Sequence, residues 1–403
     1  MKHKVFLLLY GLGIAVHVNI VGQLSLSEIL AFVSMPFTKI RSLLTRYPVL
    51  IKIGIYYALL LVSLMLSDIA NESSPEDYLR GWATVIFSVV SIFFLVSQLS
   101  KHPHYCVYYL MGCVIIYILW DGGDGNIDMS LMEENTNYFK ARLMRFVNPA
   151  VLLLSYWLCN VKRSKYAVLL LFAYALFCIV VDARSNSLAY FTATLLLFIK
   201  LNKINITLGK AIFVGLVSLC LGYFAYIFYV DRVLYHDFGG QNAQKQLAMT
   251  KNPYNPFELL FIGRMDVFIA IEAIKDRPLI GYGSWGKDPD GKYQQLSEEW
   301  SDRELTMIQP YIKSHSVLFT AWLWGGLGGL IFILLILSTF IKMGVSVYKK
   351  LNHMGLLVII LPQFIEMIWH FLFSPFGYIR TLLPFISAFI IVCYYRTKQT
   401  RTC

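Results

Sequence analysis

Residues 49–67 read VLIKIGIYYALLLVSLMLS, an apolar run in which Lys52 is the only charged residue. A helix needs about 20 such residues to cross the hydrocarbon core of a bilayer. Similar runs recur along all 403 residues, of which 57% are hydrophobic and 15% charged. Soluble domains are about 25% charged, so this composition excludes a soluble enzyme, a disordered chain and a disulfide scaffold. It predicts an all-α polytopic membrane protein.

About 12 transmembrane helices are expected, and the direction of the chain follows from the charges between them. The candidate spans are residues 4–21, 24–40, 49–67, 80–99, 104–120, 147–161, 166–183, 186–200, 210–230, 316–341, 352–373 and 376–396. With the N-terminus inside, the cytoplasmic segments hold 19 basic residues and no acidic one, and the opposite side holds 16 basic and 22 acidic residues. Basic residues gather on the cytoplasmic side of membrane proteins, so we expect both termini in the cytoplasm.

Three regions follow from this topology. We expect a nine-span bundle at 1–230, a periplasmic loop at 231–315, and three C-terminal spans with a cytoplasmic tail at 316–403. Loops as long as the middle region are uncommon unless they are functional. Its apolar stretch 257–274 carries four charged residues, which predicts a helix lying at the outer membrane interface.

Several motif-like strings do not support a function. Gly281-Tyr-Gly-Ser-Trp-Gly286 matches the dinucleotide pattern literally, but it follows Arg-Pro rather than a strand. Residues 124–135 resemble a calcium loop without its central glycine and final glutamate. Asp288-Pro-Asp290-Gly is a turn by composition, with a metal site as a weak alternative. The 7 cysteines show no metal-ligand spacing, so no metal site is predicted.

Three polar positions stand where apolar spans meet the outer side. Arg184 and Asn186 follow span seven. Arg184 either extends to the lipid headgroups or binds an anion, and a guanidinium beside a helix start favours the anion site. Arg264 lies on the interfacial stretch and pairs either with a ligand or with Asp266 or Glu258. His315 lies where the loop re-enters the membrane, either as an ordinary interface residue or as a general base.

The last spans add further ionisable residues. Glu366 and His370 are four residues apart on one helix face, where they either bond to each other or serve a function. Arg380 is a third arginine near the outer side. Arginines hold phosphate oxygens bidentately, and fixed cations stabilise the charge that develops on a departing diphosphate. Together these residues predict chemistry on an anionic substrate, most simply a diphosphate.

The order of these elements resembles the O-antigen polymerase and O-antigen ligase superfamily of bacterial envelope glycosyltransferases. Three features carry the resemblance: Arg184-x-x-x-Leu188, then Arg264 followed by Asp276-Arg-Pro-Leu-Ile-Gly-Tyr-Gly-Ser-Trp285, and then His315-Ser316, nine residues and Gly326-x-x-Gly329. The large outer loop before the last spans also fits. The motifs themselves lie within 184–329 and near 373–380.

This resemblance implies a GT-C-like fold and an inverting, metal-independent transferase with no cofactor, located in the bacterial inner membrane with a periplasmic active site. The donor and acceptor would be undecaprenyl diphosphate-linked oligosaccharides, and the partners would be the bilayer and a chain-length regulator protein, with no nucleic acid. Arg184 and Arg264 would hold the donor diphosphate, and His315 would orient or deprotonate the acceptor hydroxyl. Asn186, Ser316 and Arg380 are expected to contribute to substrate binding.

The two branches of the superfamily differ in their acceptor, and both stay open from the sequence. A polymerase moves a growing glycan onto the sugar of a new lipid-linked repeat unit, whereas a ligase moves the finished chain onto lipid A-core. The Gly-Tyr-Gly-Ser-Trp string, the segment 373–380 and residues 22–28 favour the polymerase. A transporter of lipid-linked oligosaccharides is a remote alternative, because charge at mid-membrane depth is limited to Glu28 and Glu366 and no repeat is visible.

Overall fold

The computed structural model describes residues 1–19, 22–35, 37–120, 135–181, 183–204, 208–236, 244, 247–301 and 311–399. This part of the chain is helical apart from one two-stranded hairpin. Its elements are α1 (Lys2–Gly13), β1 (His17–Asn19), β2 (Gln23–Ser25), α2 (Leu26–Val33), α3 (Ile40–Arg46), α4 (Val49–Ala70), α5 (Pro75–Leu99), α6 (Cys106–Leu119), α7 (Asn135–Asn160), α8 (Ser164–Val180), α9 (Arg184–Leu201), α10 (Leu208–Tyr235), α12 (Pro256–Gly263), α13 (Met265–Asp276), α14 (Lys292–Ser301), α15 (Val317–Lys350), α16 (Met354–Phe373), α17 (Tyr378–Thr381) and α18 (Leu383–Gln399).

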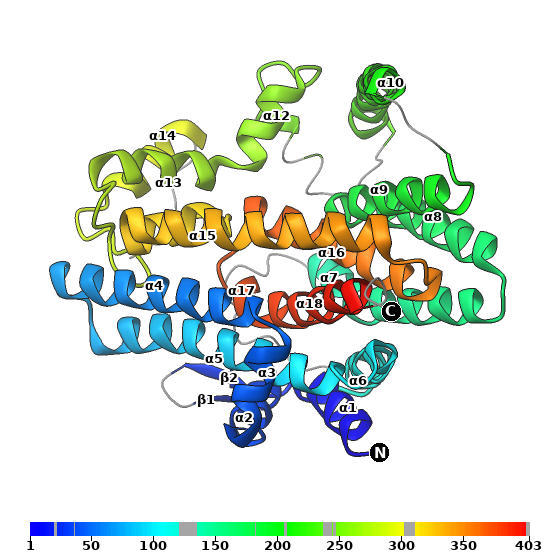
Figure 1. Cartoon of the computed structure of the whole chain (residues 1–403). Coiled ribbons are helices and arrows are strands. Elements are labelled where there is room, and N and C mark those ends of the chain that lie inside the picture. The colour runs from blue at the N-terminus through cyan, green and yellow to red at the C-terminus, as the bar shows by residue number, and fades with distance from the viewer. Residues whose placement is uncertain are drawn as a thin grey trace.

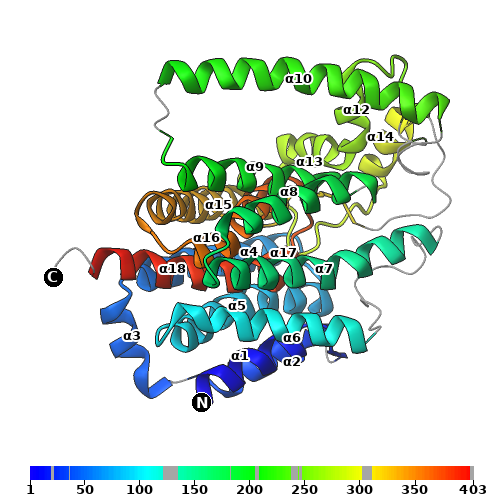
Figure 2. The ribbon, with the colours of Figure 1, turned by 90° about the vertical axis from the view of Figure 1, so that its right-hand side faces the viewer.

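The long helices lie side by side in stacked layers (Figure 1). Helix α4 packs against α5 and α15, and α18 lies between α5 and α15. Helix α16 packs against α7, α9 and α15, so it joins the two halves of the bundle. Figure 2 shows α10 running apart from these layers, on the side of α8 and α9.

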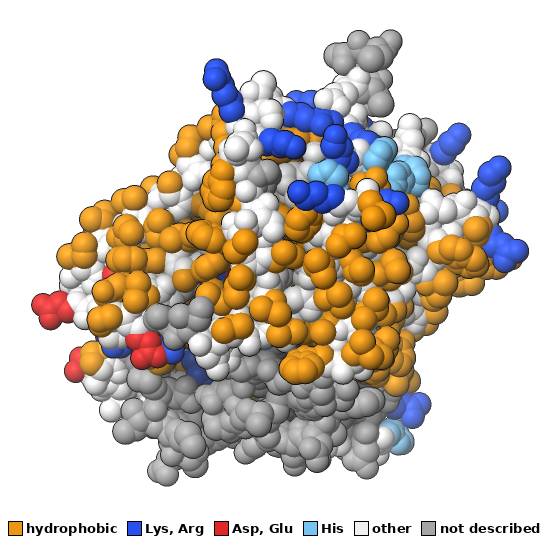
Figure 3. All heavy atoms as spheres, turned by 90° about the horizontal axis from the view of Figure 1, so that it is seen from below, with side chains coloured by type: hydrophobic (Ala, Val, Ile, Leu, Met, Phe, Trp, Pro, Cys, Tyr) orange, Lys and Arg blue, Asp and Glu red, His pale blue; other side chains and the backbone are white. Residues whose placement is uncertain are grey.

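The molecule is an all-α membrane protein. Among the described residues, α4, α5, α15 and α16 are long and apolar enough to cross a bilayer, and α8 and the segment Pro103–Leu119 are shorter apolar helices. The full set of twelve spans therefore stays a prediction. Figure 3 shows a wide apolar surface beside one end where Lys, Arg and His side chains gather, and the few Asp and Glu side chains in view lie away from that end. This distribution is the one that a bilayer-spanning bundle needs.

The N-terminal segment differs from the expected spans 4–21 and 24–40. Helix α1 has 12 residues and α2 has 8, which at 1.5 Å per residue is too short for either to cross a core of about 30 Å. A hairpin separates them, in which His17 pairs with Ser25 and Asn19 with Gln23. Ser25 then starts α2 with a capping box, because its hydroxyl accepts the Glu28 N–H at 3.3 Å and the Glu28 carboxylate accepts the Ser25 N–H at 2.8 Å.

Helix α15 is broken at Gly326, whose φ of 57° and ψ of −147° are open only to glycine. The segment between α13 and α14 fills the break. The Tyr282 N–H donates to the Leu323 carbonyl at 2.7 Å, and the Leu327 N–H donates to the Leu279 carbonyl at 3.0 Å. Two residues beyond the break, a Cβ on Gly328 would lie 1.9 Å from the Ser63 hydroxyl, so this glycine allows α4 and α15 to approach closely.

The apolar stretch 257–274 forms two helices, α12 and α13, rather than the single helix expected. They separate at Arg264, whose φ of −135° and ψ of 24° are not helical. Helix α13 packs against α15 and α14, which holds this part of the loop beside the start of α15. The break therefore places Arg264 at the junction of two helix ends.

Candidate functional site

The imidazole of His315 lies against a carboxylate that the sequence had not assigned to it. Its Nε2 is 3.1 Å from Oδ2 of Asp266, in the first turn of α13, and the two side chains are 54% and 28% exposed. His315 precedes Ser316, the N-cap of α15, so the packing of α13 on α15 brings the pair together. A carboxylate that accepts the Nε2 proton leaves Nδ1 as the atom that can take a proton from a substrate.

Arg264 makes neither of the ion pairs considered from the sequence. Asp266 is engaged by His315, and the Glu258 carboxylate accepts the Asn252 N–H at 2.9 Å. The guanidinium of Arg264 instead donates from Nη1 to the Phe373 carbonyl at 3.3 Å and lies over the rings of Trp369 and Phe373, with its Cζ 5.5 and 5.1 Å from their centroids. Burial lowers the pKa of Arg264 from its usual value, although an arginine remains charged.

Ser316 contacts the same end of α16. Its hydroxyl lies 3.4 Å from the Phe371 carbonyl and accepts the Phe319 N–H at 3.3 Å as the cap of α15. The side chain is fully buried. The structure therefore brings His315, Ser316 and Arg264 together around the C-terminal turn of α16, and it gives Ser316 a structural role in addition to the predicted substrate contact.

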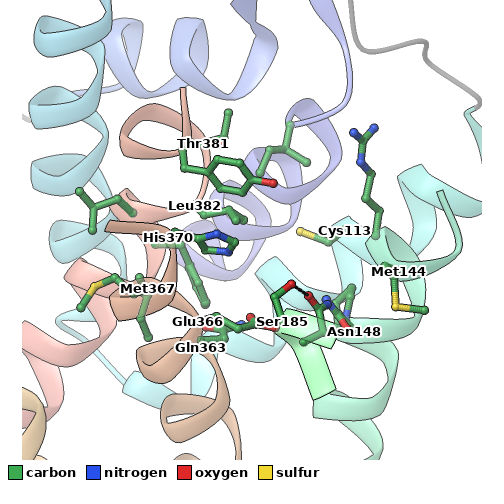
Figure 4. Close-up of a pocket in the computed structure, with 18 of the residues that line it drawn as sticks. Cys113, Met144, Asn148, Ser185, Gln363, Glu366, Met367, His370, Thr381 and Leu382 are labelled. Carbon is green, nitrogen blue, oxygen red and sulfur yellow. Dashed lines mark hydrogen bonds between the residues drawn. The ribbon is translucent and has the colours of Figure 1, made fainter. Parts of the chain in front are cut away.

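Arg184 and Asn186 lie elsewhere, in a cavity of 720 Å³ that α7, α9, α16 and the segment after α16 enclose. Sites for small ligands commonly measure about 300–1,000 Å³. Arg184 is the first residue of α9, and its Cζ lies 5.4 Å from the centroid of the Tyr229 ring on α10. Asn186 accepts from the Ser185 hydroxyl at 3.5 Å (Figure 4). Arg145 and Asn148 of α7 reach the same cavity.

The wall of this cavity opposite α9 belongs to α16. Figure 4 shows Gln363, Glu366 and His370 there, facing Ser185 and Asn148. Nδ1 of His370 is 2.7 Å from the Ser374 hydroxyl, and the ring stacks on Tyr378 with centroids 4.2 Å apart. Oε1 of Glu366 is buried with no hydrogen-bond partner. The histidine thus bonds to Ser374, and the Glu366 carboxylate has an unmet acceptor in the cavity.

Arg380 is placed differently from the other predicted site residues. Its guanidinium forms an ion pair with Glu28, at 16% and 3% side-chain exposure, and also donates to the Gln23 carbonyl. This contact ties the start of α17 to the N-terminal hairpin and explains how Glu28 is tolerated among apolar residues. Substrate binding by Arg380 stays a prediction, and the contacts that are visible are structural.

The Gly-Tyr-Gly-Ser-Trp string docks the segment between α13 and α14 on the end of α4. The carboxylate of Asp68 accepts the Ser284 N–H at 2.6 Å, its hydroxyl at 2.9 Å and the Trp82 indole N–H at 2.8 Å. Farther along, the Asp77 carboxylate 2.9 Å away raises the pKa of Lys287. The string follows helix α13 instead of a strand, so its similarity to a dinucleotide motif is fortuitous.

Asp288 caps α14, because its Oδ2 accepts the N–H groups of Tyr293 and Gln294 at 2.9 and 3.0 Å. Within the described residues, no group of three or more His, Cys, Asp or Glu side chains is arranged to hold a metal ion. The calcium-like string at 124–135 lies outside the part whose side chains are described.

No model of a known protein family matches the chain, and no curated protein shows significant sequence similarity to it.

Sequence reasoning missed four residues that the structure places at these sites: Asp266, Gln363, Tyr190 and Asn148. One of them, Gln363, had a recognisable signal. Gln363, Glu366 and His370 are spaced by three and four residues on one span, so they share a face of the helix. Asp266 carried none, because its partner lies 49 residues later in the chain.

Proposed function

We propose that this chain is an O-antigen polymerase of the bacterial inner membrane. It transfers a growing glycan from undecaprenyl diphosphate to a sugar hydroxyl of a new lipid-linked repeat unit on the periplasmic face, with both termini in the cytoplasm. The observation that carries the proposal is the His315–Asp266 pair at 3.1 Å, beside Arg264 at the junction of two helices. An imidazole that a carboxylate orients is the usual arrangement of a general base.

In this proposal the acceptor hydroxyl approaches Nδ1 of His315. As the hydroxyl oxygen forms a bond to the anomeric carbon of the donor sugar, its proton passes to Nδ1, and the imidazolium is stabilised by Asp266. The bond from the anomeric carbon to the diphosphate breaks, and the electron pair leaves with the diphosphate. Arg264 offers fixed positive charge beside His315, and Arg184 binds the same diphosphate from the adjoining cavity, whose lining includes Val317 and Phe371 next to Ser316. The attack on the face opposite the leaving group inverts the anomeric centre.

The long outer loop supports the same proposal through its architecture. It anchors His315 from two directions, through α13 and through the Tyr282–Leu323 contact in the break of α15. A catalytic base must be held in place by rigid neighbours, and this loop supplies them.

The experiment that tests the function uses a deletion strain of the source bacterium and its lipopolysaccharide on a gel. A core that carries one repeat unit, without a ladder, supports a polymerase. A bare core with polymer left on undecaprenyl diphosphate would assign the ligase reaction instead. The ladder should return with the wild-type gene and not with His315→Ala, while both proteins are present in the membrane at equal levels.

A further inference from the structure

The cavity beside α16 contains three buried polar atoms that the protein itself leaves without hydrogen-bond partners. They are Oε1 of Gln363, Oε1 of Glu366 and the hydroxyl of Tyr190. An unmet buried polar group is costly, and most such groups in proteins are paired. Three of them around one cavity of 720 Å³ indicate a bound molecule that completes their hydrogen bonds.

The chemistry of these atoms restricts that molecule. The amide oxygen of Gln363 only accepts hydrogen bonds, whereas a protonated carboxyl and a phenol hydroxyl can donate or accept. The molecule must therefore bring at least one donor to this part of the cavity. A diphosphate has only acceptor oxygens when it is ionised, so it fits the arginine side of the cavity and not this one. A metal cation is disfavoured because Arg145, Arg184 and His17 also line the cavity.

Sugar hydroxyls both donate and accept, and they suit all three atoms. The rings of His370 and Tyr378, which stack on each other, also line the cavity. We propose that Gln363, Glu366 and Tyr190 form a sugar-binding subsite that recognises the hydroxyls of a lipid-linked glycan whose diphosphate lies on the Arg184 side. This inference rests on the proposed function for the identity of the lipid carrier.

The subsite divides the cavity into two parts. The first turn of α9, with Arg184 and Asn186, faces the phosphate, which is common to every lipid-linked sugar. Gln363 and Glu366 of α16, with Tyr190 farther along α9, bind the sugar ring and therefore select the repeat unit. The variants Glu366→Gln and Tyr190→Phe remove an acidic group or a hydroxyl with almost no change in volume. Neither change removes a hydrogen bond of Glu366 Oε1 or of the Tyr190 hydroxyl to the rest of the protein.

The test measures binding to the purified full-length protein in nanodiscs with two probes. One is undecaprenyl diphosphate, and the other is the same lipid carrying the repeat unit, isolated from the deletion strain. We expect the wild-type protein to bind the glycosylated lipid more tightly. Each variant should lose roughly 2- to 12-fold in affinity for the glycosylated lipid alone, the worth of one hydrogen bond. Tyr57→Phe is the matched control, because its buried hydroxyl also lacks a partner but lies outside the cavity.

Several outcomes separate this inference from the proposed function. Unchanged affinity for the glycosylated lipid in both variants would overturn the subsite, and so would an equal loss of affinity for the bare lipid. Selective loss with the glycosylated lipid, from a protein that forms no polymer when acceptor is supplied, would support the subsite and refute the polymerase. Normal polymer formation by both variants, with an unchanged KM for the acceptor and donor, would refute the subsite and support the polymerase.

Discussion

Replacing Asp266 with asparagine tests whether the carboxylate supports the chemistry of His315. The amide keeps the size of the side chain and its ability to accept a hydrogen bond, so the position of the imidazole should change little. The negative charge that stabilises an imidazolium is lost. The effect should therefore fall on the rate of transfer rather than on folding or on substrate binding.

The separation of 3.1 Å between Nε2 and Oδ2 sets the size of the effect. Two unit charges at this distance attract by about 1.3 kcal/mol in water and by about 5 kcal/mol at an effective dielectric constant of about 20. The side chains are 54% and 28% exposed, which places the pair toward the lower end, at about 2 kcal/mol. Since 1.36 kcal/mol corresponds to a factor of ten, Asp266→Asn should slow transfer about 30-fold.

The assay is single-turnover transfer between two lipid-linked repeat units, one of them labelled, with purified protein in nanodiscs. His315→Ala should lose about 10²- to 10⁴-fold, the usual contribution of a general base. Glu272→Gln is the matched control, because it removes a carboxylate from the same helix whose partner is Lys275 at 2.6 Å. A wild-type rate for Asp266→Asn, together with inactivity of His315→Ala, would refute the role assigned to the carboxylate.

Four further results are expected. Arg184→Lys and Arg264→Lys should each retain only part of the transfer activity, because a point charge cannot reproduce a bidentate guanidinium; full activity of both would indicate simple electrostatic anchoring. Gly328→Ala should destabilise the fold by about 1–3 kcal/mol in thermal unfolding in detergent, and Ser63→Gly should restore most of this loss by removing the atoms that the new methyl group meets. Asp68→Ala should expose the docked loop to trypsin, seen as early cleavage in limited proteolysis, because buried donors lose their acceptor. Transfer should continue in the presence of a chelator, and a loss that added divalent metal reverses would contradict the metal-independent mechanism.

The parts of the fold that depend on local hydropathy could be predicted closely. The runs 49–67 and 352–373 correspond to α4 (Val49–Ala70) and α16 (Met354–Phe373). Each residue in such a run contributes to membrane partition on its own, so the sum can be taken from the sequence. The break in α15 could not be found in this way, because Gly326 fits both an unbroken helix with small residues and a bend that another segment stabilises.

The N-terminal error had a visible cause. The run 24–40 is apolar enough to suggest a span, and its Glu28 was therefore treated as a charge within the membrane. The pattern of serine followed three residues later by glutamate also predicts a capping box, which is what Ser25 and Glu28 form. The two signals together predict a helix that begins after Ser25 and explain Glu28 as part of its cap. The ion pair of Glu28 with Arg380 could not be predicted, because the two residues are 352 positions apart.

The site could be predicted as a set of residue types but not as a set of pairs. Asp266 stands two residues after Arg264, so the sequence left an ion pair between them open. The non-helical backbone at Arg264 turns its side chain away from that of Asp266. The packing of α13 on α15 then brings His315 next to the Asp266 carboxylate instead. Such choices depend on the angle between helices, and no spacing along the chain encodes that angle.

The two groups of site residues meet at the end of α16, and this gives Arg264 a second role. A helix leaves its last carbonyls without internal partners. Here the Phe371 carbonyl receives the Ser316 hydroxyl and the Phe373 carbonyl receives Arg264. The same helix also carries Glu366 and His370 into the cavity. An alanine at position 264 would therefore remove a charge and also loosen the cavity wall, so its inactivity alone cannot assign a catalytic role. Lysine can still donate one hydrogen bond to the Phe373 carbonyl, and for this reason the lysine variant separates the two effects: binding of the glycosylated lipid should persist while transfer falls.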